Sequence, residues 1–205
     1  AVTLGGNNLA RHIENVKSFG VPVVVAINRF ITDTDAEIQA VKDLASENGV
    51  KAIECTHWSN GGKGTTKLAE EVVKLAHSGV ASFAPLYPND MAIWDKIKTV
   101  ATRLYRADDI IADKKIRAQI RKFEDDGYAH FPICIAKTQY SFSTDPNLKG
   151  APNNHVMAIR EVRLSAGAGF IVVVCGDIMT MPGLPRVPAA NNIDVDETGK
   201  ISGLF

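Results

Sequence analysis

Two aromatic residues, Phe30 and Trp58, each follow an apolar segment that has the composition of a β-strand. Neither residue falls on a helical or alternating pattern that would bury it. Two flat side chains on neighbouring loops can sandwich a flat ring, and each pairing contributes about 0.5–1.5 kcal/mol beyond the buried area. The pair therefore indicates a site for a planar ligand. The alternative interpretation is that both rings cap the local core.

The elements that position these rings are two strands joined by a helix. Residues 21–27 form a continuous β-branched run, and residues 50–55 form the next strand-like segment. Between them, Thr34 and Glu37 have capping-box spacing, which predicts a helix that ends at Gly49. This order and size are typical of a parallel βαβ unit. Both loops then leave the carboxyl edge of the sheet, where open α/β sheets bind ligands.

The loop at residues 60–66 is rich in glycine and precedes a helix expected from about residue 65 to residue 77. Its backbone N–H groups could hold an anion. The P-loop spacing G-x-x-x-x-G-K-[ST] is not met, because Lys63 precedes Gly64. A simple tight turn is the alternative interpretation.

The loop after the first strand has some likeness to the N-K-x-D loop with which GTPases read guanine. Asn28 follows the strand, but Arg29 replaces the lysine and Asp33 comes two positions too late. The second half of a GTPase-like P-loop protein is therefore kept as an alternative function.

Composition excludes several other classes. Lys and Arg number 23, as do Asp and Glu, so no basic field attracts nucleic acid or an anionic membrane. The longest apolar run, residues 169–175, is much shorter than the roughly 20 residues needed to cross a bilayer. No metal-ligand spacing is present, so no metal site is expected, and no residue is assigned a catalytic role. Three cysteines are expected to be reduced, small hydrophobic residues: Cys55, Cys134 and Cys175.

The remainder of the chain predicts a second group of elements. A connector of residues 81–90 leads to helices at 91–106 and 113–126, and Trp94 is expected in the core. A short strand at 132–136 and a long polar loop at 138–154 follow. Residues 155–165 and 169–176 are expected to form an adjacent strand pair, and a proline-rich tail begins at residue 181.

Several blocks of the sequence resemble one family, formate–tetrahydrofolate ligase, and the likeness runs along essentially the whole chain. The family's polypeptide is more than twice this length, so these residues are similar to its C-terminal third. The chain also opens on Ala1 without an initiator methionine, and we expect a fragment. The blocks are HIEN (12–15), FGVPVVVAINRF (19–30), TDT (32–34), AKTQYSFS (136–143), SAGAGF (165–170), TMPGLP (180–185) and GLF (203–205).

The resemblance implies an ATP-driven ligation in two steps. Formate attacks the γ-phosphate of Mg-ATP to give formyl phosphate, and N10 of tetrahydrofolate then attacks the activated carbon to give 10-formyltetrahydrofolate. The family keeps its P-loop and its formyl-phosphate-stabilising arginine in the N-terminal part. This chain alone is therefore expected to be inactive. A cytoplasmic homotetramer that uses ATP with Mg²⁺, and a monovalent cation, is also implied.

In the family, the pterin ring stacks between a Phe and a Trp at positions that match Phe30 and Trp58. By the same resemblance Asn28, Gly61 and Gly62 support the folate pocket. The sequence departs from the family at two positions: Ile31 stands where many members have a proline, and Glu54 stands where an apolar residue is expected in some relatives. The motif at Lys137, Thr138 and Gln139 is family-like, without an assigned role.

The expected fold is therefore α/β. A parallel βαβ-based, three-layer domain, similar to half of a P-loop NTPase, is expected over residues 1–130 and is assigned the folate site. A smaller α/β subdomain with the strand pair and the proline-rich tail follows over residues 131–205. A non-catalytic interaction domain that kept the fold without the chemistry is the second alternative.

Overall fold

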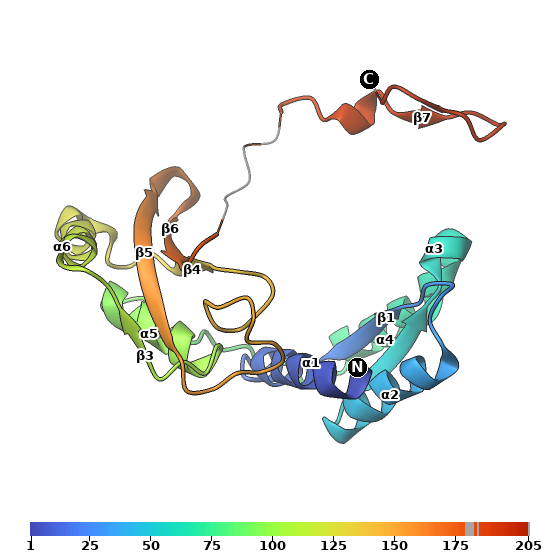
Figure 1. Cartoon of the computed structure of the whole chain (residues 1–205), viewed down its shortest axis with the longest axis horizontal. Coiled ribbons are helices and arrows are strands. Elements are labelled where there is room, and N and C mark those ends of the chain that lie inside the picture. The colour runs from blue at the N-terminus through green and yellow to red at the C-terminus, as the bar shows by residue number, and fades with distance from the viewer. Residues whose placement is uncertain (179–182, 184, 205) are drawn as a thin grey trace.

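The computed structural model describes residues 1–178, 183 and 185–204 (Figure 1). It is an α/β structure with a parallel strand pair near the N-terminus and a mixed sheet further along the chain. The elements are α1 (Val2–Lys17), β1 (Val24–Asn28), α2 (Asp35–Glu47), β2 (Lys51–Cys55), α3 (His57–Asn60), α4 (Thr66–Ala76), α5 (Ile93–Arg103), β3 (Asp109–Ile111), α6 (Lys114–Phe123), β4 (Ile133–Ala136), β5 (Val156–Ser165), β6 (Phe170–Cys175), β7 (Asp194–Val195) and β8 (Ile201–Ser202).

The predicted βαβ unit is confirmed. β1 and β2 pair in parallel, with Ala26 opposite Ile53, and α2 and α4 both pack against this pair. The capping box at the start of α2 is formed, since the Thr34 side chain accepts from the Glu37 N–H and the Glu37 carboxylate accepts from the Thr34 N–H. Gly49 follows α2 with φ of 65°, a conformation that favours glycine at a helix C-terminus.

Helix α1 begins at Val2, earlier than the helical periodicity from residue 8 predicts. Gly5 and Gly6 weaken the local helix propensity, which is why the sequence pattern misses this first turn. Gly6 is buried against α2, where a Cβ would lie 2.9 Å from a Leu44 methyl group. Tertiary packing on α2 therefore stabilises the extra turn.

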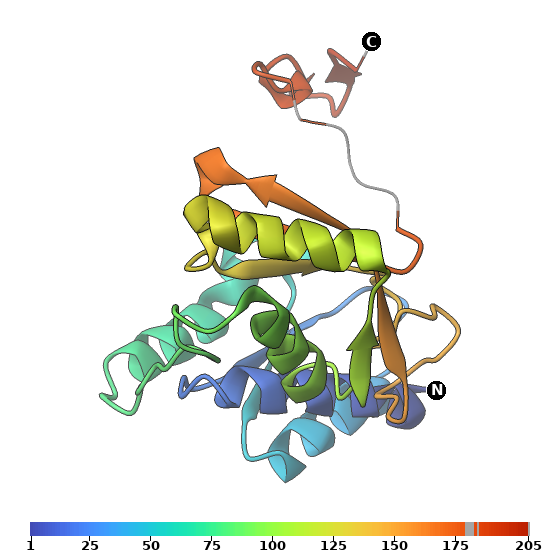
Figure 2. The same cartoon turned by 90° about the vertical axis from the view of Figure 1, so that its left-hand side faces the viewer.

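The second sheet has the order β3-β5-β6-β4. The predicted hairpin is confirmed, since β5 and β6 pair antiparallel across the turn at residues 166–168. β3 and β4 pair in parallel with β5 and β6, respectively. The sequence analysis misses β3, because it is only three residues long. Figure 2 shows the side of the molecule on which α6 lies against β5.

The main hydrophobic core lies between this sheet, α5 and α6. Ile93, Ile97, Met157, Ile171 and Val173 are each 0% exposed. Trp94 is partly buried against this core, as its helical position predicts. The core and its sheet contain residues from both sides of position 130, and the division at that position stays a prediction.

One lysine lies inside this core region. Lys96 is fully buried, and its Nζ donates to the carbonyl oxygens of Asn89, Ala129 and Phe131 at 2.7, 2.6 and 3.2 Å. Three acceptors satisfy the three N–H bonds of the ammonium group, which offsets much of its desolvation. Burial nevertheless lowers the pKa of Lys96. The lysine thereby connects α5 to the segments that precede and follow it.

Residues 138–154 form the predicted long loop, with no helix or strand. The loop is not loosely attached, since Thr138, Ser141, Phe142 and Ser143 are all buried. The Asn8 side chain of α1 donates to the Gly150 carbonyl in this loop, and the Asn15 side chain donates to the Leu104 carbonyl at the end of α5. Because α1 also packs against α2, these bonds connect the loop and α5 to the βαβ unit. Helix α1 accordingly lies between the two sheets (Figure 1).

The C-terminal tail contains the short antiparallel pair β7–β8. Most of the TMPGLP block and the final residue of the GLF block lie outside the described residues. Within the described ranges, no helix combines the length and the apolar character that a membrane span requires.

Candidate functional site

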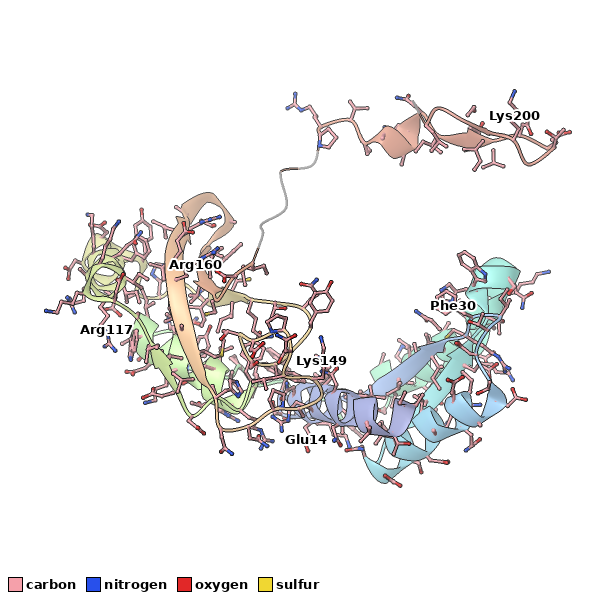
Figure 3. All side chains as sticks on the ribbon, in the orientation of Figure 1. Glu14, Phe30, Arg117, Lys149, Arg160 and Lys200 are labelled. Carbon is pink, nitrogen blue, oxygen red and sulfur yellow. The ribbon has the colours of Figure 1, made fainter. Side chains whose placement is uncertain are left out.

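Phe30 and Trp58 lie side by side at the carboxyl edge of the β1–β2 pair. Their ring centroids are 5.9 Å apart and their planes are inclined by 50°. Both rings are accessible, with 50% of Phe30 and 69% of Trp58 exposed. Figure 3 shows Phe30 beyond the end of β1, next to the α3 end of the molecule. The structure therefore brings together the two aromatic residues that the sequence singles out.

A tight turn after β1 fixes Phe30. The Phe30 N–H donates to the Asp33 carboxylate at 2.8 Å, and the Asp33 N–H donates back to the Phe30 carbonyl at 3.1 Å. The preceding Arg29 N–H donates to the carbonyl of Cys55 at the end of β2, at 3.0 Å. These bonds hold the backbone of the turn, while the ring itself stays at the surface.

A charged network lies directly behind this turn. The Arg29 guanidinium bonds to Glu54 at 2.8 Å and to Asp35 at 2.6 Å, and Lys42 lies 3.4 Å from the other Glu54 oxygen. The bond from Arg29 lowers the pKa of Glu54, and the Glu54 carboxylate raises the pKa of Arg29. Glu54 thus balances the charge of Arg29 beside the Phe30 turn.

Trp58 is carried by the single-turn helix α3, which runs into a short 3₁₀ segment at Gly61–Thr65. The sequence analysis expects an irregular glycine-rich loop here, and this expectation is wrong. Gly61 adopts φ of 55°, a conformation that disfavours other residues. The Gly64 carbonyl accepts from the Thr56 N–H at 3.1 Å. A Cβ on Gly64 would lie 2.5 Å from the Thr56 carbonyl carbon and the His57 nitrogen.

The spacing of the two rings sets what can enter between them. A flat ring that stacks on both faces needs about 7 Å between the flanking planes, two contacts of about 3.5 Å each. The observed 5.9 Å separation and 50° tilt correspond to two rings in direct contact. A stacked ligand would therefore require a small separation and levelling of the rings. Both side chains are at the surface, where such a rotation meets little resistance.

The comparisons with known proteins decide the family. The sequence profile of formate–tetrahydrofolate ligase matches residues 1–205. The chain belongs to the formate–tetrahydrofolate ligase family. It is 62% identical over 205 residues to the formate–tetrahydrofolate ligase of Ruegeria pomeroyi, 63% to that of Ruegeria sp. (strain TM1040) and 59% to that of a Sphingobium species. Each alignment covers 100% of this chain and 37% of the relative. The chain thus spans little more than a third of these ligases.

Within this family segment, Asn28, Gly61 and Gly62 are the residues that the sequence analysis expects to support the folate pocket. Asn28 is the last residue of β1 and is exposed. Gly61 and Gly62 follow directly after α3, and an added Cβ at either position would meet open space. The three residues share the edge that carries the rings, and their contact with folate stays a prediction.

Two residues that shape this ligase segment are missed by the sequence analysis. Asp33 appears there only as a misplaced guanine-reading carboxylate, whereas the structure uses it to close the Phe30 turn. Gly64 appears there only as a mismatch to the P-loop spacing. No local signal distinguishes Gly64 from its neighbours, because its requirement arises from the close approach of Thr56 and His57.

The described part of the chain shows no group of three or more His, Cys, Asp or Glu side chains that could hold a metal ion. The glycine-rich segment lacks the P-loop spacing in its sequence.

Proposed function

We propose that this chain supplies the folate-binding portion of an ATP-dependent ligase that joins formate to tetrahydrofolate. The observation that supports the proposal most directly is the exposed pair of Phe30 and Trp58 at the carboxyl edge of the parallel strands. Exposure of two adjacent aromatic rings costs apolar burial, so it favours a ligand that covers them. Membership of the formate–tetrahydrofolate ligase family supports the pterin ring of tetrahydrofolate as that ligand.

The proposed reaction proceeds through formyl phosphate to 10-formyltetrahydrofolate. Formate is a poor acyl donor because an oxide would have to leave, and phosphorylation converts that oxygen into a good leaving group. In this scheme Phe30 and Trp58 bind and orient the pterin, so that N10 is directed toward the activated carbon. ATP and its Mg²⁺ would be held by residues outside this chain, since no P-loop spacing occurs in it.

We further propose that the βαβ unit belongs to a larger three-layer sheet of the P-loop-NTPase type. An open groove of about 830 Å³ lies along β2 and is lined by Lys51, Ala52, Ile53 and Glu54 of that strand and by residues of α4. A strand edge with unpaired backbone groups is suited to accept another strand. The cytoplasmic location, the tetramer and the monovalent cation stay predictions from the family resemblance.

The two alternatives are less well supported. In a GTPase-like protein the residues after Asn28 would read guanine, yet here Arg29 is engaged by Glu54 and Asp35, and Asp33 closes the backbone turn. Guanine nucleotides would raise the melting temperature of a GTPase, and we expect no such rise. A non-catalytic interaction domain would bind no folate.

The first test uses a chimera in which residues 1–205 replace the matching segment of the Ruegeria pomeroyi ligase. Trp58→Ala in this chimera should weaken tetrahydrofolate binding by about 1–3 kcal/mol, because the pterin loses one stacking face. The matched control is Phe83→Ala. Phe83 is 66% exposed and stacks on Phe19 with centroids 6.3 Å apart, away from the strand edge.

Calorimetric titration with tetrahydrofolate separates the outcomes. Equal affinities for the Trp58→Ala variant and the unaltered chimera would contradict the proposed site. The isolated 205-residue chain should not form 10-formyltetrahydrofolate from formate and ATP, whereas the chimera should. Turnover by the isolated chain would show that the phosphate chemistry also resides in these residues.

A further inference from the structure

A second cavity lies apart from the aromatic pair, between α1 and the loop that follows β4. Its volume is about 310 Å³, and its lining includes Asn8, His12, Tyr105, Lys137, Thr138 and Phe142. It therefore contains the Lys137–Thr138 motif to which the sequence analysis assigns no role. Figure 3 shows Glu14 and Lys149, which mark this region near α1, separated from Phe30.

Lys137 is the charged group of this cavity. Its Nζ donates to the carbonyls of Thr138, at 3.0 Å, and Ser141, and it lies 5.0 Å from the centre of the Tyr105 ring. An ammonium group has three N–H bonds, so one stays available after these two. Among the described residues, no carboxylate lies within 4 Å of Lys137.

Of the other titratable groups nearby, His12 lines the cavity, whereas Arg11 and His155 are not among its lining residues. His12 packs on Phe142, with ring centroids 4.7 Å apart, and the Arg11 guanidinium lies 5.9 Å from the centre of the same ring. Arg11 is only 9% exposed, and its Nη1 is buried without a hydrogen-bond partner among the described residues. Both ring nitrogens of His155 are likewise buried and without a side-chain bond there.

The lining of the cavity carries no carboxylate, and the carboxylates nearby, Glu14 and Asp108, act on Arg11 and His155. Glu14 lies 3.4 Å from Arg11, but the same carboxylate oxygen is shared with Arg106 at 3.0 Å. Burial is the main cause that lowers the pKa of Lys137, to about 8, and it also lowers the pKa of His12, which the Lys137 charge lowers further. Lys137 is half-buried and His12 is exposed. A half-buried ammonium group without a carboxylate partner loses part of its hydration, and an anion that enters the cavity would offset this cost.

We propose that this cavity binds an oxyanion, a carboxylate or phosphate group, through Lys137, His12 and the Thr138 hydroxyl. The Thr138 hydroxyl accepts from the Tyr140 N–H at 3.3 Å, which leaves its proton free to donate. Charge-assisted hydrogen bonds from an ammonium and a hydroxyl fit both kinds of oxyanion. The site does not depend on stacking at Phe30 and Trp58.

The test is calorimetric titration of the 205-residue chain with inorganic phosphate and, separately, with glutamate, in chloride buffer at constant ionic strength. Tighter binding of phosphate identifies a phosphate site, and tighter binding of glutamate identifies a carboxylate site. Lys137→Met should weaken the binding of the preferred anion about tenfold or more, since hydrogen bonds to charged groups contribute at least that factor to the affinity. Lys137→Arg should retain most of the affinity.

Lys149→Met is the matched control. Lys149 belongs to the same loop and lies 5.0 Å from the Tyr140 ring, but it is exposed and does not line the cavity. Binding in this variant should stay within about twofold of the unaltered chain, because exposed charges act weakly. An equal loss of anion affinity in Lys137→Met and Lys149→Met, or no binding of either anion at millimolar concentration, would overturn the proposal.

If Lys137→Met does not fold, the unaltered chain still provides a test. The ring protons of His12 should shift in nuclear magnetic resonance spectra as the anion is added, and those of His77, an exposed histidine after α4, should not. Equal shifts at both histidines, or none at either, would overturn the proposal.

Discussion

The βαβ unit that carries the aromatic pair and the region built on the four-stranded sheet are stabilised in different ways. Before residue 85, the buried apolar side chains are few: Ile13, Ile27, Ile38, Ala45 and Cys55. Helix α4 buries none of its residues, whereas α6 buries Ile116, Ile120 and Phe123. Within these 205 residues the second region has a continuous core, whereas the first presents the open strand edge at which we propose that a larger sheet continues.

This difference explains where the candidate folate site lies. A two-stranded sheet with open edges leaves its loops and their aromatic residues at the surface, where a ligand can reach them. The four-stranded sheet buries its central strands and contributes stability. The comparison teaches that the main core and the loops of the candidate site are separated in this chain, with α1 between them.

The largest expected effect is the loss of a core side chain. Ile97→Ala should lower the free energy of unfolding by about 4 kcal/mol, because Ile97 is 0% exposed in the dense core. Ile27→Ala, at 8% exposure in the two-stranded sheet, should lower it by about 2 kcal/mol, since that site can relax. Urea denaturation measures both values. An equal or larger loss at Ile27 would show that the two regions do not differ as described.

A smaller effect is expected where the backbone approaches itself behind Trp58. Gly64→Ala should lower the free energy of unfolding by about 1–3 kcal/mol, because its Cβ meets backbone atoms at 2.5 Å. Gly62→Ala is the control in the same segment, since nothing lies within 4 Å of its Cβ. Thermal unfolding of the two variants compares them directly. Indistinguishable melting temperatures would mean that the segment does not need the close approach.

The remaining prediction concerns pH. Burial lowers the pKa of Lys137 from 10.5 to about 8. The folded chain therefore releases this proton near pH 8, while the unfolded chain keeps it up to about 10.5. The unfolded state binds more protons in this window, so the folded state gains stability as the pH rises through it. Relative to Lys137→Met, the unaltered chain should become more stable between pH 7.5 and 10.

Urea denaturation at several pH values, in buffers without oxyanions, measures this difference. Cys175, whose pKa burial raises to about 11, and Tyr105, whose pKa burial also raises, are present in both proteins. Comparison with Lys137→Met therefore reports the proton of the lysine together with the effect of its charge on Cys175 and His12. If the free energy of unfolding of the two proteins changes with pH in the same way, the lowered pKa of the half-buried Lys137 is contradicted.

Much of the fold could be predicted from local sequence. The capping box at Thr34 and Glu37, the β-branched run of β1 and the hairpin around residues 166–168 are encoded by neighbouring residues. Strand β3 and the first turn of α1 could not be predicted in this way. Both are stabilised by partners distant in sequence, β5 for the strand and Leu44 of α2 for the helix.

The candidate site likewise has some features that local sequence predicts and others that depend on distant segments. The positions of Phe30 and Trp58 after two parallel strands predict that the rings meet at one edge, and they do. The requirement for Gly64 and the pairing of Arg29 with Glu54 depend on three-dimensional approach between separate segments. The family-like motif at Lys137 was visible in the sequence, but the cavity beside it depends on α1, which lies more than a hundred residues earlier.

The most direct measurement of the central claim is a crystal structure of the chimera with bound tetrahydrofolate. The account predicts that the pterin lies between Phe30 and Trp58, with the ring centroids moved apart from 5.9 Å to about 7 Å and the planes nearly parallel. A pterin bound elsewhere, with the two rings still 5.9 Å apart and in contact with each other, would contradict it.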